Sequence, residues 1–164
     1  MNPGRSPLEY KVPRIPTSLP KLPGKAYIPE EEVKTLLSDE VVVEEKLDGQ
    51  QRWFDIGNLR IYYEDMSEVR KIRYESLPSE VIAFDVYDFR TGSFLDYERK
   101  IEVLESLGMV LVPLLFRGRL ESPEDALKFL REPSAFGAPL VEGVVIKNYK
   151  KQLFGKIVNP DFDE

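Results

Sequence analysis

A lysine that is followed by an aspartate and a glycine is the first candidate for chemistry in this sequence. Lys46-Leu47-Asp48-Gly49 comes directly after the apolar run Val41–Glu45, which predicts a buried strand that ends at the lysine. Because a desolvated ammonium is costly, a buried strand that presents a lysine suggests that the amine has a task. A solvated lysine before an Asp-Gly turn is the alternative.

Two further lysines lie in apolar segments near the C-terminus. Glu142 and Lys147 stand at the two ends of one such segment, and Lys156 lies within another. Side chains five positions apart in a regular strand point to opposite faces, so Glu142 and Lys147 share a face only if a bulge intervenes. Each charge could belong to an edge strand, but three lysines with acids beside them are harder to explain together in this way.

Missing residue types narrow the chemistry. The 164 residues include no Cys and no His, which excludes disulfides, thiolate zinc sites, Cys nucleophiles and Ser-His arrangements. Lys, Asp, Glu, Arg, Tyr or a bound metal must therefore carry any reaction. The 32% of charged residues and the 13 Pro are typical of a thermophile.

The charge distribution favours a local phosphate site. The net charge of −6 argues against a surface that binds nucleic acid all over. Residues 1–25 and 147–156 nevertheless each carry a net charge of +4, so the remainder is strongly acidic. Two basic ends on an acidic body suit a phosphate ligand, and solvated basic tails are the alternative.

Mainly strands are needed to position these residues. A Pro-rich extended arm packed on the body is expected over residues 1–29. Helices are expected over 30–37, 96–107 and 122–131, and the second should bury Ile101, Leu104 and Leu107. Strands are expected at 41–46, 51–56, 59–63, 81–87, 110–115, 141–147 and 153–158. Hairpins join most of them, which predicts an α+β fold with largely antiparallel sheets.

The length predicts one domain over residues 1–164, with nothing after Glu164 for an accessory OB-fold or C-terminal domain. The sequence has no run of eighteen apolar residues and no apolar signal segment. We therefore expect a cytoplasmic protein without a membrane partner.

Four short segments occur in a telling order: EKLDG at 45–49, FDVYD at 84–88, EGVVIK at 142–147 and GKIV at 155–158. They resemble motifs I, IIIa, IV and V of the covalent nucleotidyltransferases, which comprise DNA and RNA ligases and mRNA capping enzymes. The surrounding sequence, from residue 14 to the C-terminus, looks most like that of ATP-dependent RNA ligases. The chain resembles a minimal version of such a ligase. The resemblance implies a nucleotidyltransferase (ATP-grasp-like) domain, with two sheets, short flanking helices and a nucleotide pocket between the sheets.

The resemblance also implies site residues. Lys46 would be the nucleophile that takes AMP from ATP, with Mg²⁺ or Mn²⁺ bound through Glu142. The other residues expected at the nucleotide are Glu45 and Phe84 at the adenine, Glu64 at the ribose, Lys147 and Lys156 at phosphate, and Asp48 and Gly49 of the first motif. Arg60 is the expected match for the arginine that holds ribose or the RNA end, and Arg52 is its rival.

A lysine in this role must lose a proton. At its ordinary pKa near 10.4, only about one amine in a few thousand is neutral at pH 7, a cost of roughly 4–5 kcal/mol. Burial and neighbouring cations would lower this pKa.

The sequence departs from the RNA ligase pattern between the first motif and Glu64. Only fourteen residues separate Gly49 from Glu64, Tyr63 replaces the usual Gly, and Gln51 replaces the usual Asn. Val158 also stands where a second lysine is common. These departures weigh more against full ligation than against nucleotide binding.

The predicted function is a ligase that forms Lys46-AMP, transfers AMP to the 5′-phosphate of an RNA (or DNA) end, and joins that end to a 3′-hydroxyl, as in RNA repair. An accessory protein could grip the substrate, and the oligomeric state is left open. A guanylyltransferase and a non-catalytic module that binds nucleotides or RNA ends are the alternatives.

Overall fold

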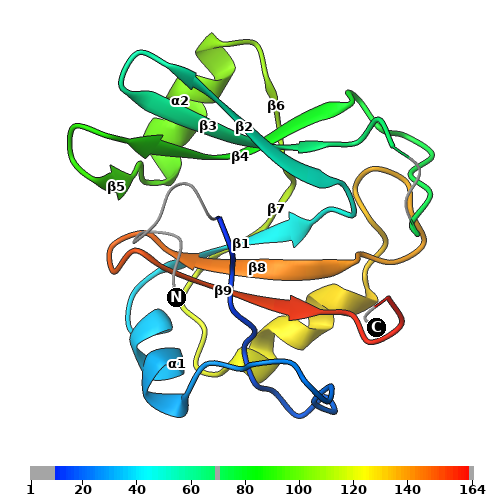
Figure 1. The fold of residues 1–164 in the computed structure, drawn as a ribbon. Coiled ribbons are helices and arrows are strands. Elements are labelled where there is room, and N and C mark those ends of the chain that lie inside the picture. Colours follow the sequence, from blue (N-terminus) through cyan, green and yellow to red (C-terminus); the bar gives the residue numbers. More distant parts are fainter. Residues whose placement is uncertain (1–9, 69–70, 163–164) are drawn as a thin grey trace.

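The computed structural model describes residues 10–68 and 71–162. Its strands form two sheets, one above the other in Figure 1. The first sheet has the order β7-β1-β8-β9, with β1 (Val41–Lys46), β7 (Leu114–Gly118), β8 (Gly143–Asn148) and β9 (Leu153–Val158). The second contains β2 (Gln50–Ile56), β3 (Leu59–Asp65), β4 (Val81–Asp88) and β5 (Ser93–Phe94), and β6 (Val110–Leu111) pairs with β4.

Both sheets are antiparallel apart from the short β4–β6 pair. The helices are few and lie outside them: α1 (Glu30–Leu36) and the 3₁₀ helix η2 (Pro123–Arg131) beside the first sheet, and α2 (Tyr97–Ser106) on the second (Figure 1). The predicted α+β class with two largely antiparallel sheets is confirmed.

The first sheet has one apolar face and one charged face. Val41 and Val43 of β1 join a core with Leu36 of α1 and Leu130 of η2. Side chains alternate along a strand, so Val42, Glu44 and Lys46 point to the other face, toward the second sheet. Glu44 and Lys46 therefore carry their charges into the space between the sheets.

The second sheet separates an apolar core from an aromatic one. Ile61 and Val86 pack with Leu104 of α2 on the outer face. On the inner face, Tyr62 and Phe84 pack with Phe154 of β9. The aromatic core therefore joins the two sheets beside the charged face of β1.

The strand predicted at 110–115 is in fact two strands in different sheets. Val112 donates its N–H to the carbonyl oxygen of Ala83 in the second sheet, while the carbonyl oxygen of Pro113 accepts from the N–H of Glu45 in the first. Pro113 has no N–H to continue a ladder, so the chain changes sheets there.

Other expectations differ in detail. The third predicted helix is a 3₁₀ helix that begins with a capping box of Ser122 and Asp125. In α2, Lys100 and Leu104 are the buried residues, whereas the predicted inner residue Leu107 is 37% exposed. The hydrophobic spacing could not identify a buried lysine.

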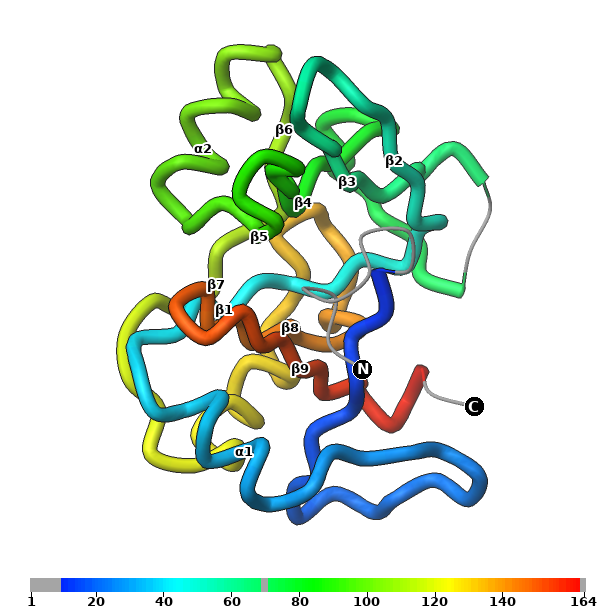
Figure 2. The backbone as a smooth tube through the Cα atoms, turned by 60° about the vertical axis from the view of Figure 1, so that its left-hand side comes forward, coloured from blue at the N-terminus to red at the C-terminus, as the bar shows by residue number. Residues whose placement is uncertain are grey.

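The arm is extended and packed on the body over its described part. Ile15 donates to the carbonyl oxygen of Lys156, and Lys156 donates to that of Pro13, both at 2.9 Å. Figure 2 shows the arm running alongside β9 before it turns toward α1. Residues 1–9 of the predicted arm lie outside the described residues.

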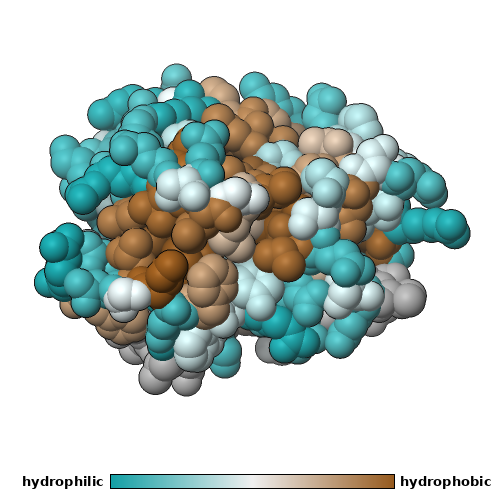
Figure 3. Space-filling model, turned by 90° about the horizontal axis from the view of Figure 1, so that it is seen from above, coloured by the Kyte–Doolittle hydropathy of each residue, from teal (hydrophilic) through white to brown (hydrophobic). Residues whose placement is uncertain are grey.

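Figure 3 views the molecule from above Figure 1 and shows apolar side chains gathered in the middle of that face, with polar ones around them. Within the described residues, no helix is both long and apolar enough to cross a bilayer.

Candidate functional site

A cavity of about 480 Å³ lies between the charged face of the first sheet, the inner face of the second sheet and the arm. Strands β1, β8 and β9 provide its lining from one side, and β3 and β4 provide it from the other. The charged lining residues are Lys11, Arg14, Glu44, Glu45, Lys46, Asp48, Glu64, Lys147 and Lys156. Of the predicted residues, Gly49 and Phe84 also line the cavity.

Lys46 ends β1 at this cavity and forms an ion pair with Glu142. Its Nζ lies 2.8 Å from Oε2 and 3.0 Å from Oε1 of Glu142. The pairing of Lys46 with Gly143 in the β1–β8 ladder brings Glu142 beside it, just before β8 begins. Burial raises the pKa of Glu142, and the charge of Lys46 opposes that rise. The predicted nucleophile and metal ligand are therefore neighbours.

Asp48 and Gly49 fix the turn after Lys46. The Asp48 carboxylate accepts the N–H of Ile72 at 3.0 Å, and the Asp48 N–H donates to the hydroxyl of Tyr74 at 2.9 Å. A Cβ at Gly49 would lie 2.5 Å from Met66 Sδ and 2.9 Å from a backbone carbonyl oxygen. The motif thus needs Gly for close approach and Asp to hold the segment that passes over the turn.

Glu45 is buried and hydrogen-bonded by the loop after η2. Its carboxylate accepts from Ser134 Oγ at 2.5 Å and from the N–H of Ala135 at 3.2 Å. Burial raises the pKa of Glu45, and these hydrogen bonds moderate the rise. Glu45 lines the cavity, and its carboxylate also anchors the loop.

Four buried charges form a cluster beside the cavity, and two of them, Glu44 and Lys147, line it. Lys147 Nζ lies 2.6 Å from Glu44 and 2.6 Å from Asp85. Lys100 Nζ lies 2.6 Å from Glu44, and the hydroxyl of Tyr149 donates to Asp85 at 2.6 Å. Burial disfavours the charge of Lys147, but Asp85 and Glu44 outweigh it and raise its pKa. Lys147 lines the cavity as expected, yet its ammonium is held by carboxylates.

Phe84 lies on the cavity wall against the arm. The Tyr10 ring packs edge-on against it, with 4.8 Å between centroids, and the Tyr10 hydroxyl donates to Asp85. Lys147 Nζ lies 5.4 Å from the centroid of the Phe84 ring. Phe84 is 7% exposed, and the part that lines the cavity offers an aromatic contact for a base.

Arg60 is not among the residues that line the cavity. Its guanidinium donates to Asp55 at 2.7 and 2.9 Å and lies 3.6 Å from the centroid of the Trp53 ring. It is four positions from Glu64 on one strand, or roughly 13 Å. The placement does not support the predicted nucleotide contact. The rival, Arg52, pairs with Asp65 at 2.8 Å.

Several lining residues were missed by the sequence reasoning. Tyr10, Lys11 and Arg14 come from the arm, and Glu44 comes from β1. The basic excess in residues 1–25 was a signal for Lys11 and Arg14. Glu44 lies on the face of β1 that also carries Lys46. No sequence pattern indicated that the distant Lys100 would form an ion pair with it.

The carboxylates at the cavity could contribute to a metal site only in small number. The ranges 10–68 and 71–162 contain no group of three or more acidic side chains arranged to hold an ion. Mg²⁺ and Mn²⁺ are often held by one or two carboxylates together with substrate phosphates. Glu142 beside Lys46 fits that limited role.

This chain is similar to known proteins in sequence and in fold. A family model described as RNA ligase matches residues 50–158, beginning four residues after Lys46. Naegleria gruberi RNA ligase with PPi is similar in fold, with a TM-score of 0.66 and 16% identity over 96% of this chain and 61% of that chain. A variant of that ligase with ATP and Mn gives 0.63 and 16% over 80% and 52%. This chain thus spans between half and two thirds of those chains. Curated protein sequences gave no match.

Proposed function

Because the chain belongs to the RNA ligase family, we propose that it takes AMP from ATP onto Lys46 and passes it to the 5′-phosphate of an RNA end. The main support for this proposal is the ion pair of Lys46 with Glu142 beside a cavity that also presents basic side chains. Nucleotidyl transfer through a lysine requires such a combination of a positioned amine and surrounding cations.

The first step forms one bond and breaks one. The neutral Lys46 Nζ attacks the α-phosphorus, the bond from that phosphorus to the bridging oxygen breaks, and pyrophosphate leaves with the electron pair. The Lys46 ammonium must lose one proton before the attack, and its nitrogen loses a second one as the phosphoramidate forms. Glu142 is the carboxylate next to the amine, so it is placed to accept the first of these protons.

The remaining motif residues have roles consistent with their places. Phe84 would stack on the base, Glu64 would accept hydrogen bonds from the ribose, and Lys156 would contact phosphate. Lys147 would contact phosphate while its ammonium remains paired with Glu44 and Asp85. A divalent ion held by Glu142 and the ATP phosphates would neutralise phosphate charge when bound.

Residue spacing gives further support. Solved variants of the Naegleria gruberi ligase replace a lysine and an aspartate two positions apart, and a glutamate and a lysine fourteen positions apart. Lys46 and Asp48, and Glu142 and Lys156, have the same separations here. We propose that these residues serve corresponding purposes.

Transfer of AMP to RNA and sealing with a 3′-hydroxyl are the later steps of the proposal. One domain over residues 1–164 would perform the adenylylation, with an accessory protein as a candidate for gripping the RNA. A cytoplasmic location and an RNA repair role belong to the same proposal.

Intact mass measurement tests the first step. The protein is incubated with ATP and Mg²⁺ or Mn²⁺, denatured and weighed; we expect a gain of one AMP. The gain should vanish in Lys46→Ala and persist in Lys34→Ala, which removes an exposed lysine of α1. A gain from GTP alone would indicate a guanylyltransferase, and nucleotide binding without any adduct would indicate a non-catalytic module.

The second step is tested with 5′-phosphorylated strands. Adenylylated protein is mixed with single-stranded or nicked RNA and with matched DNA. We expect AMP to appear on the RNA 5′ end. Transfer to DNA alone would overturn the assignment of RNA as the acceptor.

A further inference from the structure

The arm brings two basic side chains to the cavity, and neither of them belongs to a motif. Lys11 and Arg14 both line it, alongside Lys156 of β9. Lys147 also lines the cavity, but Glu44 and Asp85 hold its ammonium. The arm therefore adds cations on the side of the cavity formed by β9.

The backbone of the arm is fixed at both ends of this stretch. At one end, Tyr10 packs against Phe84 and donates to Asp85. At the other, the backbone groups of Pro13 and Ile15 bond to those of Lys156. Lys11 and Arg14 thus extend from a held segment rather than from a loose tail.

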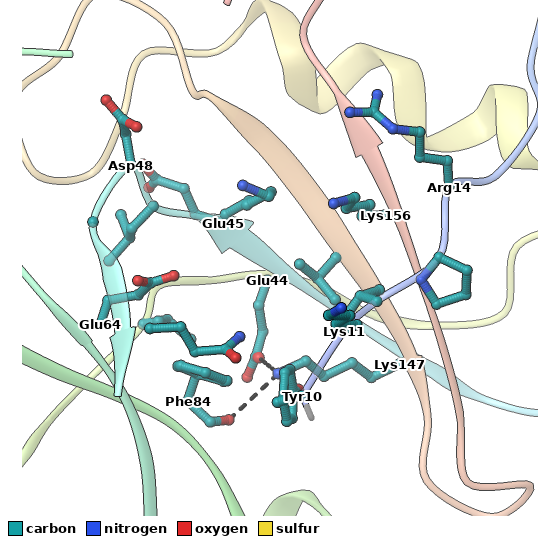
Figure 4. A pocket seen from close by; sticks show the side chains of 18 of the residues that line it. Tyr10, Lys11, Arg14, Glu44, Glu45, Asp48, Glu64, Phe84, Lys147 and Lys156 are labelled. Atoms are coloured by element: carbon teal, nitrogen blue, oxygen red, sulfur yellow. Dashed lines mark hydrogen bonds and ion pairs between the residues drawn. The ribbon is translucent and has the colours of Figure 1, made fainter. Parts of the chain in front are cut away.

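Arg14 and Lys156 are directly paired in a parallel bridge. Their side chains therefore stand side by side, and Figure 4 shows the guanidinium and the ammonium directed to the same side. Adjacent like charges repel each other, so an anion between them is stabilising. The pair is suited to bind a multiply charged anion.

The charges of the cavity are segregated. Figure 4 places the carboxylates of Glu45, Asp48 and Glu64 on one side, with Arg14 and Lys156 on the other. Ribose hydroxyls and base amino groups donate hydrogen bonds, whereas phosphates only accept them. A nucleoside triphosphate would therefore lie with its phosphates toward the arm.

We infer that Lys11 and Arg14, together with Lys156, bind the β- and γ-phosphates of ATP, the portion that leaves as pyrophosphate. The inference rests on the proposed function, which places the α-phosphate at Lys46. The β- and γ-phosphates need cations of their own, and AMP, which has only the α-phosphate, does not need these cations. The arm residues therefore select the triphosphate and hold the leaving group.

Calorimetry in a Lys46→Ala background separates binding from chemistry. Affinities for ATP, AMP and pyrophosphate are measured with Mg²⁺ for Lys11→Gln, Arg14→Gln and Arg14→Lys. Exposed Lys34→Gln and Arg131→Gln are the matched controls. We expect Lys11→Gln and Arg14→Gln each to weaken ATP and pyrophosphate by about tenfold or more, since each loses a charged hydrogen bond. AMP affinity should change by less than about twofold on the same scale, and Arg14→Lys should retain part of the pyrophosphate affinity.

Two results would overturn the inference: unchanged ATP affinity in both Gln variants, or equal losses for ATP and AMP. Urea midpoints equal to the parent show that each variant is folded. If ATP binding is unchanged while wild type still forms the Lys46 adduct, the arm inference fails and the proposed function stands. If the Gln variants lose ATP selectively but wild type forms no adduct, the arm inference stands and the reaction fails.

Discussion

Lys46 and Glu142 are 96 positions apart, yet both carboxylate oxygens of Glu142 lie within 3.0 Å of the Lys46 ammonium. The contact depends on the β1–β8 ladder, in which Lys46 pairs with the residue after Glu142. The side chains are 26% and 12% exposed. A strand end and a loop thus create one partly desolvated amine–carboxylate pair at the cavity.

Glu142→Gln tests this pair. The amide keeps the shape and one acceptor oxygen but cannot take a proton or bind a divalent ion as strongly. We expect the single-turnover rate of the Lys46 adduct to fall by about a hundredfold or more, the range for loss of a general base. Mass measurement against time gives the rate, with exposed Glu132→Gln as the control. A rate near that of the control would contradict the assignment.

Gly49→Ala tests the close approach at the turn. The new Cβ would meet Met66 Sδ and the carbonyl oxygen of Asp65, and the second contact is with backbone that cannot rotate away. We expect a loss of about 1–3 kcal/mol in the free energy of unfolding, as for other overpacking changes. In a Met66→Ala parent, which lacks the sulfur contact, Gly49→Ala should cost less than in wild type but should still be destabilising. Wild-type stability in Gly49→Ala would mean that the turn has room to move.

Lys100→Met tests the buried charges. The substitution leaves Glu44 and Asp85 with Lys147 as their remaining lysine. We expect the free energy of unfolding to fall by about 3–5 kcal/mol, because a buried charge loses its partner. Urea denaturation measures this, and exposed Lys34→Met should stay within about 0.5 kcal/mol of wild type. Adding Glu44→Gln should restore stability in part; a further full loss would show that charge balance is not the cause.

Glu45→Gln tests the pH dependence of stability. The pKa of Glu45 lies above its ordinary value of 4.5 in the folded protein, mainly through burial. The folded state holds this proton more tightly, so wild-type stability falls as the pH rises from 4.5 through the folded pKa. Glutamine does not titrate but can still accept from Ser134. The variant should therefore gain unfolding free energy relative to wild type across this window and keep it above. Denaturation at several pH values measures the difference in unfolding free energy between the variant and wild type. A difference that does not change with pH would contradict this prediction.

The strands and the place of Lys46 at a strand end were predictable because they depend on local sequence. The apolar run before Lys46 and the Gly-Asn turn at 57–58 each identify an element without knowledge of the rest. The motif segments then indicated the family. These short-range signals were enough to predict the α+β fold that the structure shows.

The parts that were missed depend on distant pairing. The buried partners of Glu44 are Lys100 and Lys147, which are 56 and 103 positions away. Arg60 looked like a ligand residue, but its cross-strand neighbour Asp55 and the ring of Trp53 engage it instead. Periodicity describes which face a residue occupies and says nothing about which other element will cover that face.

The contact of the arm with β9 also bears on association between molecules. β9 is the last strand of its sheet, and the backbone of residues 13–15 bonds to its outer edge at Lys156. Exposed strand edges are templates for pairing with other chains, and this segment covers part of one. Detachment of the arm would uncover that edge together with the rings around Phe84, so a shortened version of the protein should tend to aggregate.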